Sequence, residues 1–327
     1  MCRFMWAAPV RGGNGAVILH CYGSVGTLAI QPLQVGMNKT LLHHQARLHD
    51  SPPVAEIQAP RPMRDAAIAL IIQGHTTFKL PAAAQSLFWD ICDMYPAIPD
   101  KTRQMFSFPE CTDGFMLQGM EYAKYTGDVD LCDRYCYWHK NRSLHANHVF
   151  SESHLYQSTS LYEQHVHAIA DGILREIWQF FHAEEEINVR DSSYFQYCAY
   201  GNHQQIVDRY YLQGKHEDGH LITLIKPTRD GLVIFPRGEE TPVHLHDDEI
   251  IIIIITGSLL TALSDGQIPP MYHAVQNSYM KIGRASLVYF VIPNLERPYR
   301  TLLGKKQVDL LKIANESHMA FGNTALA

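Results

Sequence analysis

Six consecutive isoleucines, Ile250 to Ile255, constrain the fold of this chain more than any other stretch. β-Branched side chains favour strands, and an apolar run without alternation is typical of a strand that is buried on both faces. The run is also far shorter than the ~18 to 20 apolar residues that span a bilayer. We therefore expect an interior strand with protein packed on each of its two faces.

Similar short segments follow one another through the C-terminal half of the chain. They are rich in β-branched or aromatic residues and are separated by Gly, Pro and Asp, which is typical of strands joined by turns. The predicted strands, besides the isoleucine run, are residues 194–200, 205–212, 220–226, 231–235, 258–263 and 286–292. So many short strands at close spacing indicate a double-stranded β-helix, or jelly roll.

The first half has a different pattern, because apolar residues recur there every three to four positions, as they do in helices. The predicted helices are residues 63–74, 81–106 and 160–187, with a short strand at 76–80. The fold class is therefore α+β, with a largely helical N-terminal half packed around the jelly roll. We divide the chain into an extension (1–55), a helical region (56–190), the jelly-roll core (191–300) and a tail (301–327).

Charge and cysteine usage limit the kinds of partner. The net charge is −6 and the basic residues do not gather into a patch, which argues against a nucleic-acid or membrane surface. The seven cysteines are scattered and form no zinc pattern, so we interpret them as free thiols of a cytoplasmic protein. The first 30 residues lack the continuous apolar segment of a signal peptide, so export is not expected. The oligomeric state stays open.

The segment "GKHEDGHLITL" contains the first candidate metal ligands. His216 and Asp218 flank one residue, so on an extended segment their side chains point to the same face. Non-haem iron enzymes hold Fe(II) with two histidines and one carboxylate and leave the opposite positions open. His273 lies several predicted strands later, where a sheet would return to the same place. We therefore predict His216, Asp218 and His273 as an iron site.

A second pair follows on the next predicted strand. Arg284 and Ser286 alternate onto one face, and a guanidinium beside a hydroxyl is a good receptor for a carboxylate. Tyr211, in "DRYYL", offers a further hydroxyl for the same pocket.

The array His216-x-Asp218, His273, Arg284-x-Ser286 resembles the 2-oxoglutarate/Fe(II)-dependent dioxygenases, in the branch related to isopenicillin N synthase. The resemblance covers roughly residues 60 to 300. It implies Fe(II), 2-oxoglutarate as co-substrate, O2, and ascorbate as a reductant. The products besides the oxidised substrate are succinate and CO2.

The same resemblance implies specific roles for residues. Arg284 and Ser286 anchor the far carboxylate of 2-oxoglutarate with help from Tyr211, and Phe290 packs on the substrate. The expected substrate is a small molecule of specialised or amino-acid metabolism, and the reaction is hydroxylation, desaturation or ring closure. Some relatives keep Arg-x-Ser but use no 2-oxoglutarate, so an oxidase of the same fold is the first alternative.

A cupin-type metal site is the second alternative. His244, His246 and Glu249, in "VHLHDDE", approximate the first cupin motif, and cupins are also metal-binding jelly rolls. The spacings differ from the usual motif by one residue, and this interpretation leaves Arg284-x-Ser286 unexplained. A metal-free binding protein is the third alternative.

Overall fold

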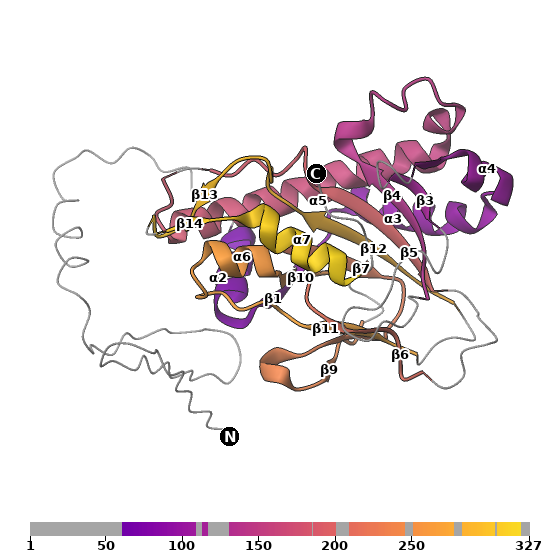
Figure 1. Cartoon of the computed structure of the whole chain (residues 1–327). Helices are drawn as coiled ribbons and strands as arrows, with labels where there is room; N and C mark the ends of the chain where they lie inside the picture. Colours follow the sequence, from indigo (N-terminus) through magenta and orange to yellow (C-terminus); the bar gives the residue numbers. More distant parts are fainter. Residues whose placement is uncertain are drawn as a thin grey trace, which may run out of the picture. The chain divides into compact units, whose positions relative to one another are not determined.

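The computed structural model describes residues 61–108, 113–116, 131–184, 186–200, 209–245, 251–277, 283–304 and 306–321. The predicted N-terminal extension, residues 1–55, lies outside these ranges. The described part combines helices with antiparallel sheets, as predicted (Figure 1). Among the described helices, none is long and apolar enough to cross a membrane.

The helices of the first half form where the three-to-four spacing of apolar residues predicts them. The helices are α2 (Arg61–Gln73), α3 (Ala82–Met94), α4 (Asp100–Met105), α5 (His154–Phe180), α6 (Ser258–Leu263) and α7 (Leu310–Ala320). The longest, α5, begins six residues before the predicted start, because the Ser153 side chain accepts a hydrogen bond from the Tyr156 amide and caps the helix there. Helices α2 and α3 pack against α5.

The strands form two larger antiparallel sheets. The eight-stranded sheet has the order β1-β10-β7-β12-β5-β4-β3-β2, and the four-stranded sheet has the order β6-β11-β8-β9. The strands of the first are β1 (His75–Lys79), β10 (Ile251–Thr256), β7 (Ile222–Pro227), β12 (Arg284–Val291), β5 (Tyr194–Tyr200), β4 (Asp133–Trp138), β3 (Asp113–Met116) and β2 (Ser107–Phe108). Those of the second are β6 (Tyr211–His216), β11 (His273–Gln276), β8 (Leu232–Ile234) and β9 (Thr241–Pro242). A third, two-stranded sheet pairs β13 (Tyr299–Arg300) with β14 (Gln307–Val308).

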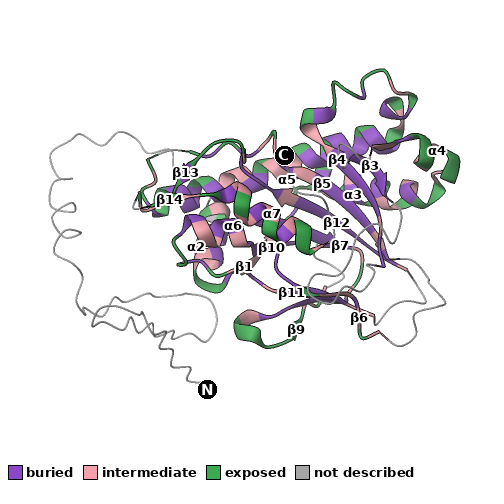
Figure 2. Ribbon diagram, in the orientation of Figure 1, coloured by how far each residue is buried: buried purple, intermediate pink, exposed green. Residues whose placement is uncertain are grey.

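Two apolar clusters cover the two faces of the eight-stranded sheet. On one face, the side chains of α2, α3 and α5 form the larger cluster. On the other face, Leu212, Leu232 and Val275 of the four-stranded sheet pack against Ile225 and Val288 of the large sheet. The large sheet is therefore a middle layer, with helices on one side and the smaller sheet on the other, and its six interior strands are buried along most of their length (Figure 2).

The isoleucine run confirms the expectation of a strand with two buried faces. β10 pairs with β1 on one side and with β7 on the other. Ile252 and Ile254 belong to the helix-side cluster, whereas Ile253 and Ile255 belong to the cluster between the sheets. Because successive side chains point to opposite faces, an alternating polar pattern would have placed polar groups in one of the two cores.

The segment "SLLTAL", predicted as a strand, is the helix α6, and that prediction is wrong. Leu259, Leu260 and Leu263 follow helical spacing and are all buried. The first half also contains more strand than expected, because β2, β3 and β4 join the large sheet. The sequence signal for β4 was the pair of tyrosines two positions apart, Tyr135 and Tyr137, which lie on the same face of a strand.

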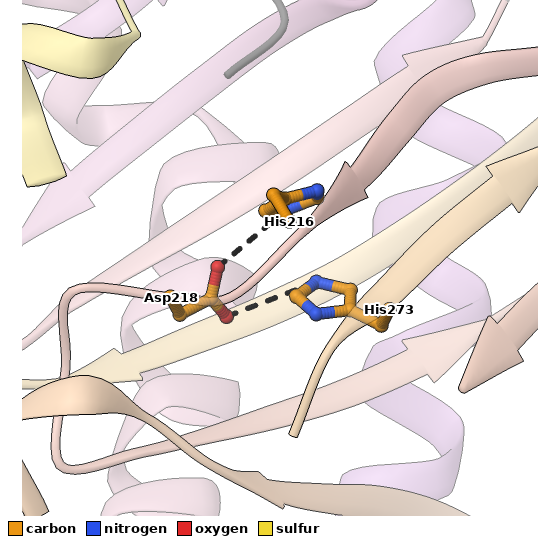
Figure 3. Close-up of side chains that lie close together, drawn as sticks. All are labelled: His216, Asp218 and His273. Atoms are coloured by element: carbon orange, nitrogen blue, oxygen red, sulfur yellow. Dashed lines mark ion pairs between the residues drawn. The ribbon is translucent and has the colours of Figure 1, made fainter. Parts of the chain in front are cut away.

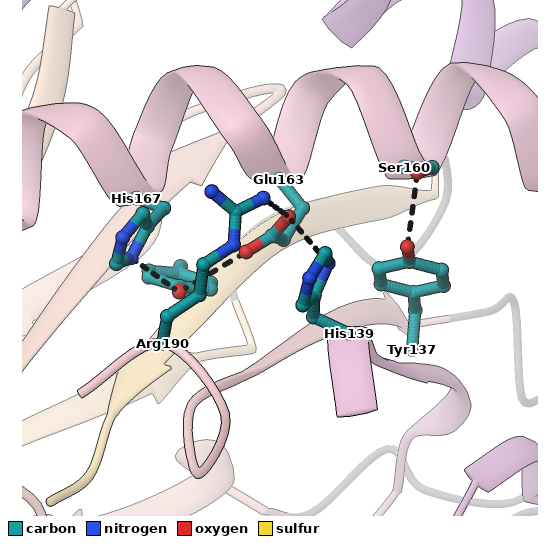
Figure 4. A network of polar contacts seen from close by, with 7 residues as sticks. Tyr137, His139, Ser160, Glu163, His167 and Arg190 are labelled. Carbon is teal, nitrogen blue, oxygen red and sulfur yellow. Dashed lines mark hydrogen bonds and ion pairs between the residues drawn. The ribbon is translucent and has the colours of Figure 1, made fainter. Parts of the chain in front are cut away.

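A buried polar network lies between α5 and the large sheet (Figure 4). The carboxylate of Glu163 accepts a hydrogen bond from the Tyr289 hydroxyl at 3.3 Å and lies 3.5 Å from the Arg190 guanidinium. His167 Nδ1 lies 3.2 Å from the Tyr289 hydroxyl. Burial raises the pKa of Glu163, and the charge of Arg190 offsets only part of this rise.

This raised pKa makes the stability of the protein depend on pH. A glutamate in the unfolded chain titrates near pH ~4.3, whereas Glu163 in the folded protein holds its proton to higher pH. The contribution of Glu163 to stability is therefore complete below the unfolded pKa and is lost as pH rises through the folded pKa. We expect Glu163→Gln to gain stability relative to the wild type as pH rises from 4 to 8. Urea unfolding of both proteins across this range tests it. A difference that does not change with pH would contradict the assignment.

Candidate active site

Strand pairing brings the two predicted histidine ligands side by side. His216 is the last residue of β6 and His273 the first of β11, and the two residues are direct partners in the antiparallel pair. Their ring centroids are 4.2 Å apart. Asp218 follows in the turn after β6 and turns its carboxylate towards both rings (Figure 3).

The three side chains are buried and converge on one point. The Nε2 atom of His216 lies 3.6 Å from Asp218 Oδ1, and the Nε2 atom of His273 lies 3.9 Å from Asp218 Oδ2. One potential ligand atom from each residue lies within 4.8 Å of the others. His216 Nδ1 lies 2.7 Å from the Gly214 carbonyl oxygen, which accepts only when Nδ1 carries the proton. The lone pair of His216 is therefore on Nε2, which faces Asp218.

The contacts of the Asp218 carboxylate favour its ionised form. Burial alone would raise its pKa, but His273, His216 and His220 together hold the pKa below its ordinary value. The Thr223 hydroxyl donates a hydrogen bond to Oδ2 at 2.6 Å. The group therefore supplies a negative charge next to two imidazole nitrogens, which is the donor set of a divalent metal site.

The turn that carries Asp218 is attached to the beginning of α6. The amide of Ser258 donates to the Asp218 carbonyl at 2.9 Å, and the amide of Leu259 donates to the His220 carbonyl at 3.1 Å. Gly257 lies so close that a Cβ atom there would be 2.3 Å from the His220 carbonyl oxygen. The segment misassigned as a strand thus positions the candidate ligand.

Arg284 and Ser286 occupy neighbouring positions on one face of β12, as their alternation predicts. The guanidinium Nη1 donates a hydrogen bond to the Ser286 hydroxyl at 2.9 Å, and Nε donates to the Asp230 carbonyl at 3.3 Å. The Arg284 residue is only 5% exposed, and burial lowers the pKa of its guanidinium. Its Nη2 atom is buried without a hydrogen-bond partner among the described residues. A buried donor of this kind is suited to an anionic ligand.

Tyr211 does not join this group, and the structure corrects its predicted position. Its hydroxyl donates to the Glu240 carboxylate at 2.6 Å, and its ring lies 6.5 Å from that of Phe235. The ammonium group of Lys215, also on β6, lies over the same Phe235 ring. Tyr211 is therefore on the outer face of the four-stranded sheet and away from the cavity. The ring beside Arg284 belongs instead to Tyr200, 5.3 Å from the guanidinium carbon.

A cavity of about 650 Å³ between the two sheets contains the candidate ligands. Ser286 and Phe290 line it, the latter at its predicted place on the wall. The C-terminal region contributes as well, since Ser317 and Phe321 line the cavity. The Phe321 ring lies 5.5 Å from the His216 ring. The predicted tail thus covers part of the candidate site, a role for which the sequence offered no signal.

His244, the one candidate ligand of the alternative cupin-type site that lies within the described residues, does not support that site. The His244 side chain is 72% exposed, and its Nδ1 atom lies 3.1 Å from Asp230 Oδ2. It does not line the cavity. His246 and Glu249 lie outside the described residues.

Comparison with known proteins finds similarity only in structure. No protein-family model and no curated protein sequence matches the chain. A 2OG-Fe(II) oxygenase family protein of Caulobacter crescentus superimposes with a TM-score of 0.62 at 17% identity, covering 78% of this chain and 92% of that one. A full-length Neurospora crassa protein in complex with alpha-KG gives 0.60 at 15%, covering 77% and 88%. The dioxygenase for auxin oxidation of rice gives 0.60 at 14%, covering 73% and 80%. The chain therefore has the fold of the 2-oxoglutarate/Fe(II) oxygenases.

Proposed function

We propose that this protein is a non-haem Fe(II), 2-oxoglutarate-dependent dioxygenase that oxidises a small molecule. One observation carries the proposal: a buried His-Asp-His group and Ser286 line one cavity from facing sheets, and buried Arg284 donates a hydrogen bond to Ser286 from behind it. The fold is that of oxygenases, and the similar Neurospora crassa protein was determined in complex with alpha-KG, which is 2-oxoglutarate. In this proposal the two facing sheets form the jelly roll.

The donor set fits Fe(II). His216 and His273 would each supply an imidazole nitrogen and Asp218 a carboxylate oxygen, and no fourth His, Cys, Asp or Glu joins their group among the described residues. Positions on the cavity side are therefore left for other ligands, as in the two-histidine, one-carboxylate sites of non-haem iron oxygenases. The Thr223 hydroxyl orients the carboxylate, and the Gly214 carbonyl orients the His216 ring.

The anchor pair fits a dicarboxylate. Arg284 Nη1 lies 2.9 Å from the Ser286 hydroxyl, and Arg284 Nη2 has no hydrogen-bond partner among the described residues, so one carboxylate could accept hydrogen bonds from the guanidinium and the hydroxyl. None of the described carboxylates forms an ion pair with Arg284, whose acceptors in this part of the chain are a hydroxyl and a carbonyl. The buried positive charge is therefore best explained by an anionic co-substrate.

With iron and 2-oxoglutarate bound, the centre would supply the activation of O2, with succinate and CO2 as co-products. The residues of the chain would bind the iron and 2-oxoglutarate, orient the substrate and shield the cavity from water. Residues 191–300 would supply the candidate ligands and anchors, 56–190 the covering helices and β2 to β4, and 301–327 a cover that includes Phe321. By excluding water, this cover would strengthen the electrostatic contacts inside the cavity.

The anchor assignment is tested by binding. Arg284→Ala should weaken 2-oxoglutarate about 100-fold, since it removes a buried charged partner, and Ser286→Ala about 10-fold, since it removes one neutral hydrogen bond. Anaerobic titration of the Fe(II)-loaded protein, followed by the weak visible absorption band of the iron/2-oxoglutarate complex, measures both affinities. Equal affinities for the wild type and Arg284→Ala would place the anchor elsewhere. Iron binding without any such band would favour an oxidase of the same fold that uses no 2-oxoglutarate.

A further inference from the structure

Three rows of cavity-side residues cross the strands of the large sheet. The registers of β7, β12, β5 and β4 align the rows. The first row contains Ser286, Cys198 and Arg134; the second contains Ile225, Val288, Gln196 and Cys136; the third contains Thr223, Phe290, Tyr194 and Trp138. All of them except Thr223 line the cavity. The first row includes the anchor hydroxyl, so the other two rows are available to a substrate.

The third row starts at the candidate metal site and consists mainly of aromatic rings. Its first member, Thr223, donates to the Asp218 carboxylate at 2.6 Å. The Trp138 and Tyr194 rings are stacked with centroids 4.3 Å apart, and Tyr194 and Phe290 follow at 4.8 Å. The His220 ring lies 4.5 Å from that of Phe290, tilted by 40°, and meets the Tyr194 ring edge-on at 5.9 Å.

Because the Trp138 and Tyr194 rings cover one another's faces, we infer that their edges are directed towards the cavity. Side chains stand roughly perpendicular to a sheet, and rings stacked along a row cover one another's faces. Ring edges carry partial positive charge and attract the face of another aromatic ring. A flat ring lying across this row would therefore make the preferred edge-to-face contacts, next to the metal ligand that Thr223 holds.

Gln196 is the polar member of the second row and is adjacent to this aromatic wall. The residue is 7% exposed and lines the cavity. Among the described residues, none forms a hydrogen bond with its side-chain amide. Its apolar neighbours in the row, Val288 and Cys136, offer no strong partner. A buried amide in this position is suited to a ligand that satisfies both its NH2 group and its oxygen.

We propose that the substrate is a planar ring compound with an adjacent hydrogen-bond donor and acceptor on one edge, as in a lactam, and that Gln196 binds this edge. An amide pairs with such an edge through two hydrogen bonds, its NH2 to the substrate oxygen and its oxygen to the substrate N–H. A carboxylate could only accept, so it would leave the Gln196 oxygen facing another acceptor. The inference rests on the proposed function, because the oxygenase reaction makes this cavity a substrate site.

Two probes of the same shape test the proposal. Quinolin-2(1H)-one is a planar lactam, and coumarin has the same rings with an ester oxygen in place of the N–H. Calorimetry on the Fe(II)/2-oxoglutarate-loaded protein, without oxygen, measures both affinities. We expect the lactam to bind about 10-fold more tightly, which is the usual effect of one net hydrogen bond. In Gln196→Leu the two probes should bind about equally, while the affinity for coumarin stays within about threefold of its wild-type value.

Several outcomes would overturn the proposal. Three of them concern the lactam: binding to the wild type no tighter than that of coumarin, no binding at all, or a preference over coumarin that survives in Gln196→Leu. The fourth is binding of quinoline-2-carboxylate more tightly than the lactam, which would indicate an anionic substrate. The Gln196→Met variant repeats the test if the leucine variant does not fold. The iron/2-oxoglutarate absorption band is measured on the same samples. A normal band with no lactam preference refutes the role of Gln196 alone, whereas a missing band in the wild type refutes the proposed function.

Discussion

Asp218→Ala is expected to lose Fe(II) and with it all turnover. The carboxylate contacts both candidate histidine ligands and is the one anion in their group. Loss of a residue that merely orients a metal ligand costs about 10- to 100-fold in affinity, so loss of a ligand should cost more than that. Iron retained after gel filtration, quantified by a chelator assay, gives the measurement, together with oxygen-dependent release of succinate from 2-oxoglutarate.

The neighbouring residue supplies a matched control for this variant. Glu217 is also a buried carboxylate, but it does not line the cavity and does not belong to the candidate metal group. Glu217→Gln should therefore keep stoichiometric iron. His216→Ala and His273→Ala should behave as Asp218→Ala does. Full activity in any of the three ligand variants would remove the residue concerned from the metal site.

Gly257→Ala should cause a large loss of stability. A Cβ atom at this position would lie 2.3 Å from the His220 carbonyl oxygen and 2.7 Å from the Asp218 carbonyl oxygen. Both contacts are with backbone, so the turn has to move as a unit and its hydrogen bonds to the Ser258 and Leu259 amides are strained. We expect a cost of about 3 kcal/mol in the free energy of unfolding, with weaker iron binding because Asp218 is displaced.

Gly172, in helix α5, provides a control in which the same substitution causes no close contact with backbone. The three atoms nearest to a Cβ atom at Gly172 all belong to the side chain of Met63, the first at 3.3 Å, and that side chain is flexible. Alanine also favours a helix interior by about 0.5 to 1 kcal/mol over glycine, so Gly172→Ala should be neutral or stabilising. Urea unfolding of both variants gives the comparison. Equal stabilities of the two variants would show that the turn at Gly257 tolerates a side chain.

The sequence determined those features that depend on local pattern. The isoleucine run predicted a strand with two buried faces because every residue in it is apolar, and the three-to-four spacing predicted α2, α3 and α5. The spacing His216-x-Asp218 placed two side chains on one face of an extended segment. Arg284 and Ser286 shared a face for the same reason. These predictions follow from the geometry of a single segment and require no knowledge of its neighbours.

Only the tertiary structure decided which segments meet. The direct pairing of His216 with His273 depends on the register between β6 and β11, which no local pattern specifies. Which face of this sheet the Tyr211 side chain occupies also depends on the strand pairing. The motif match therefore identified Tyr211 as a candidate but could not show that its side chain points away from the cavity. Leucines suit both strand and helix, and burial under the neighbouring segments selected the helix for α6. The place of the Gln196 amide on the cavity wall, with no hydrogen-bond partner among the described residues, became visible only when three strands were laid side by side, because it depends on the surroundings of the residue.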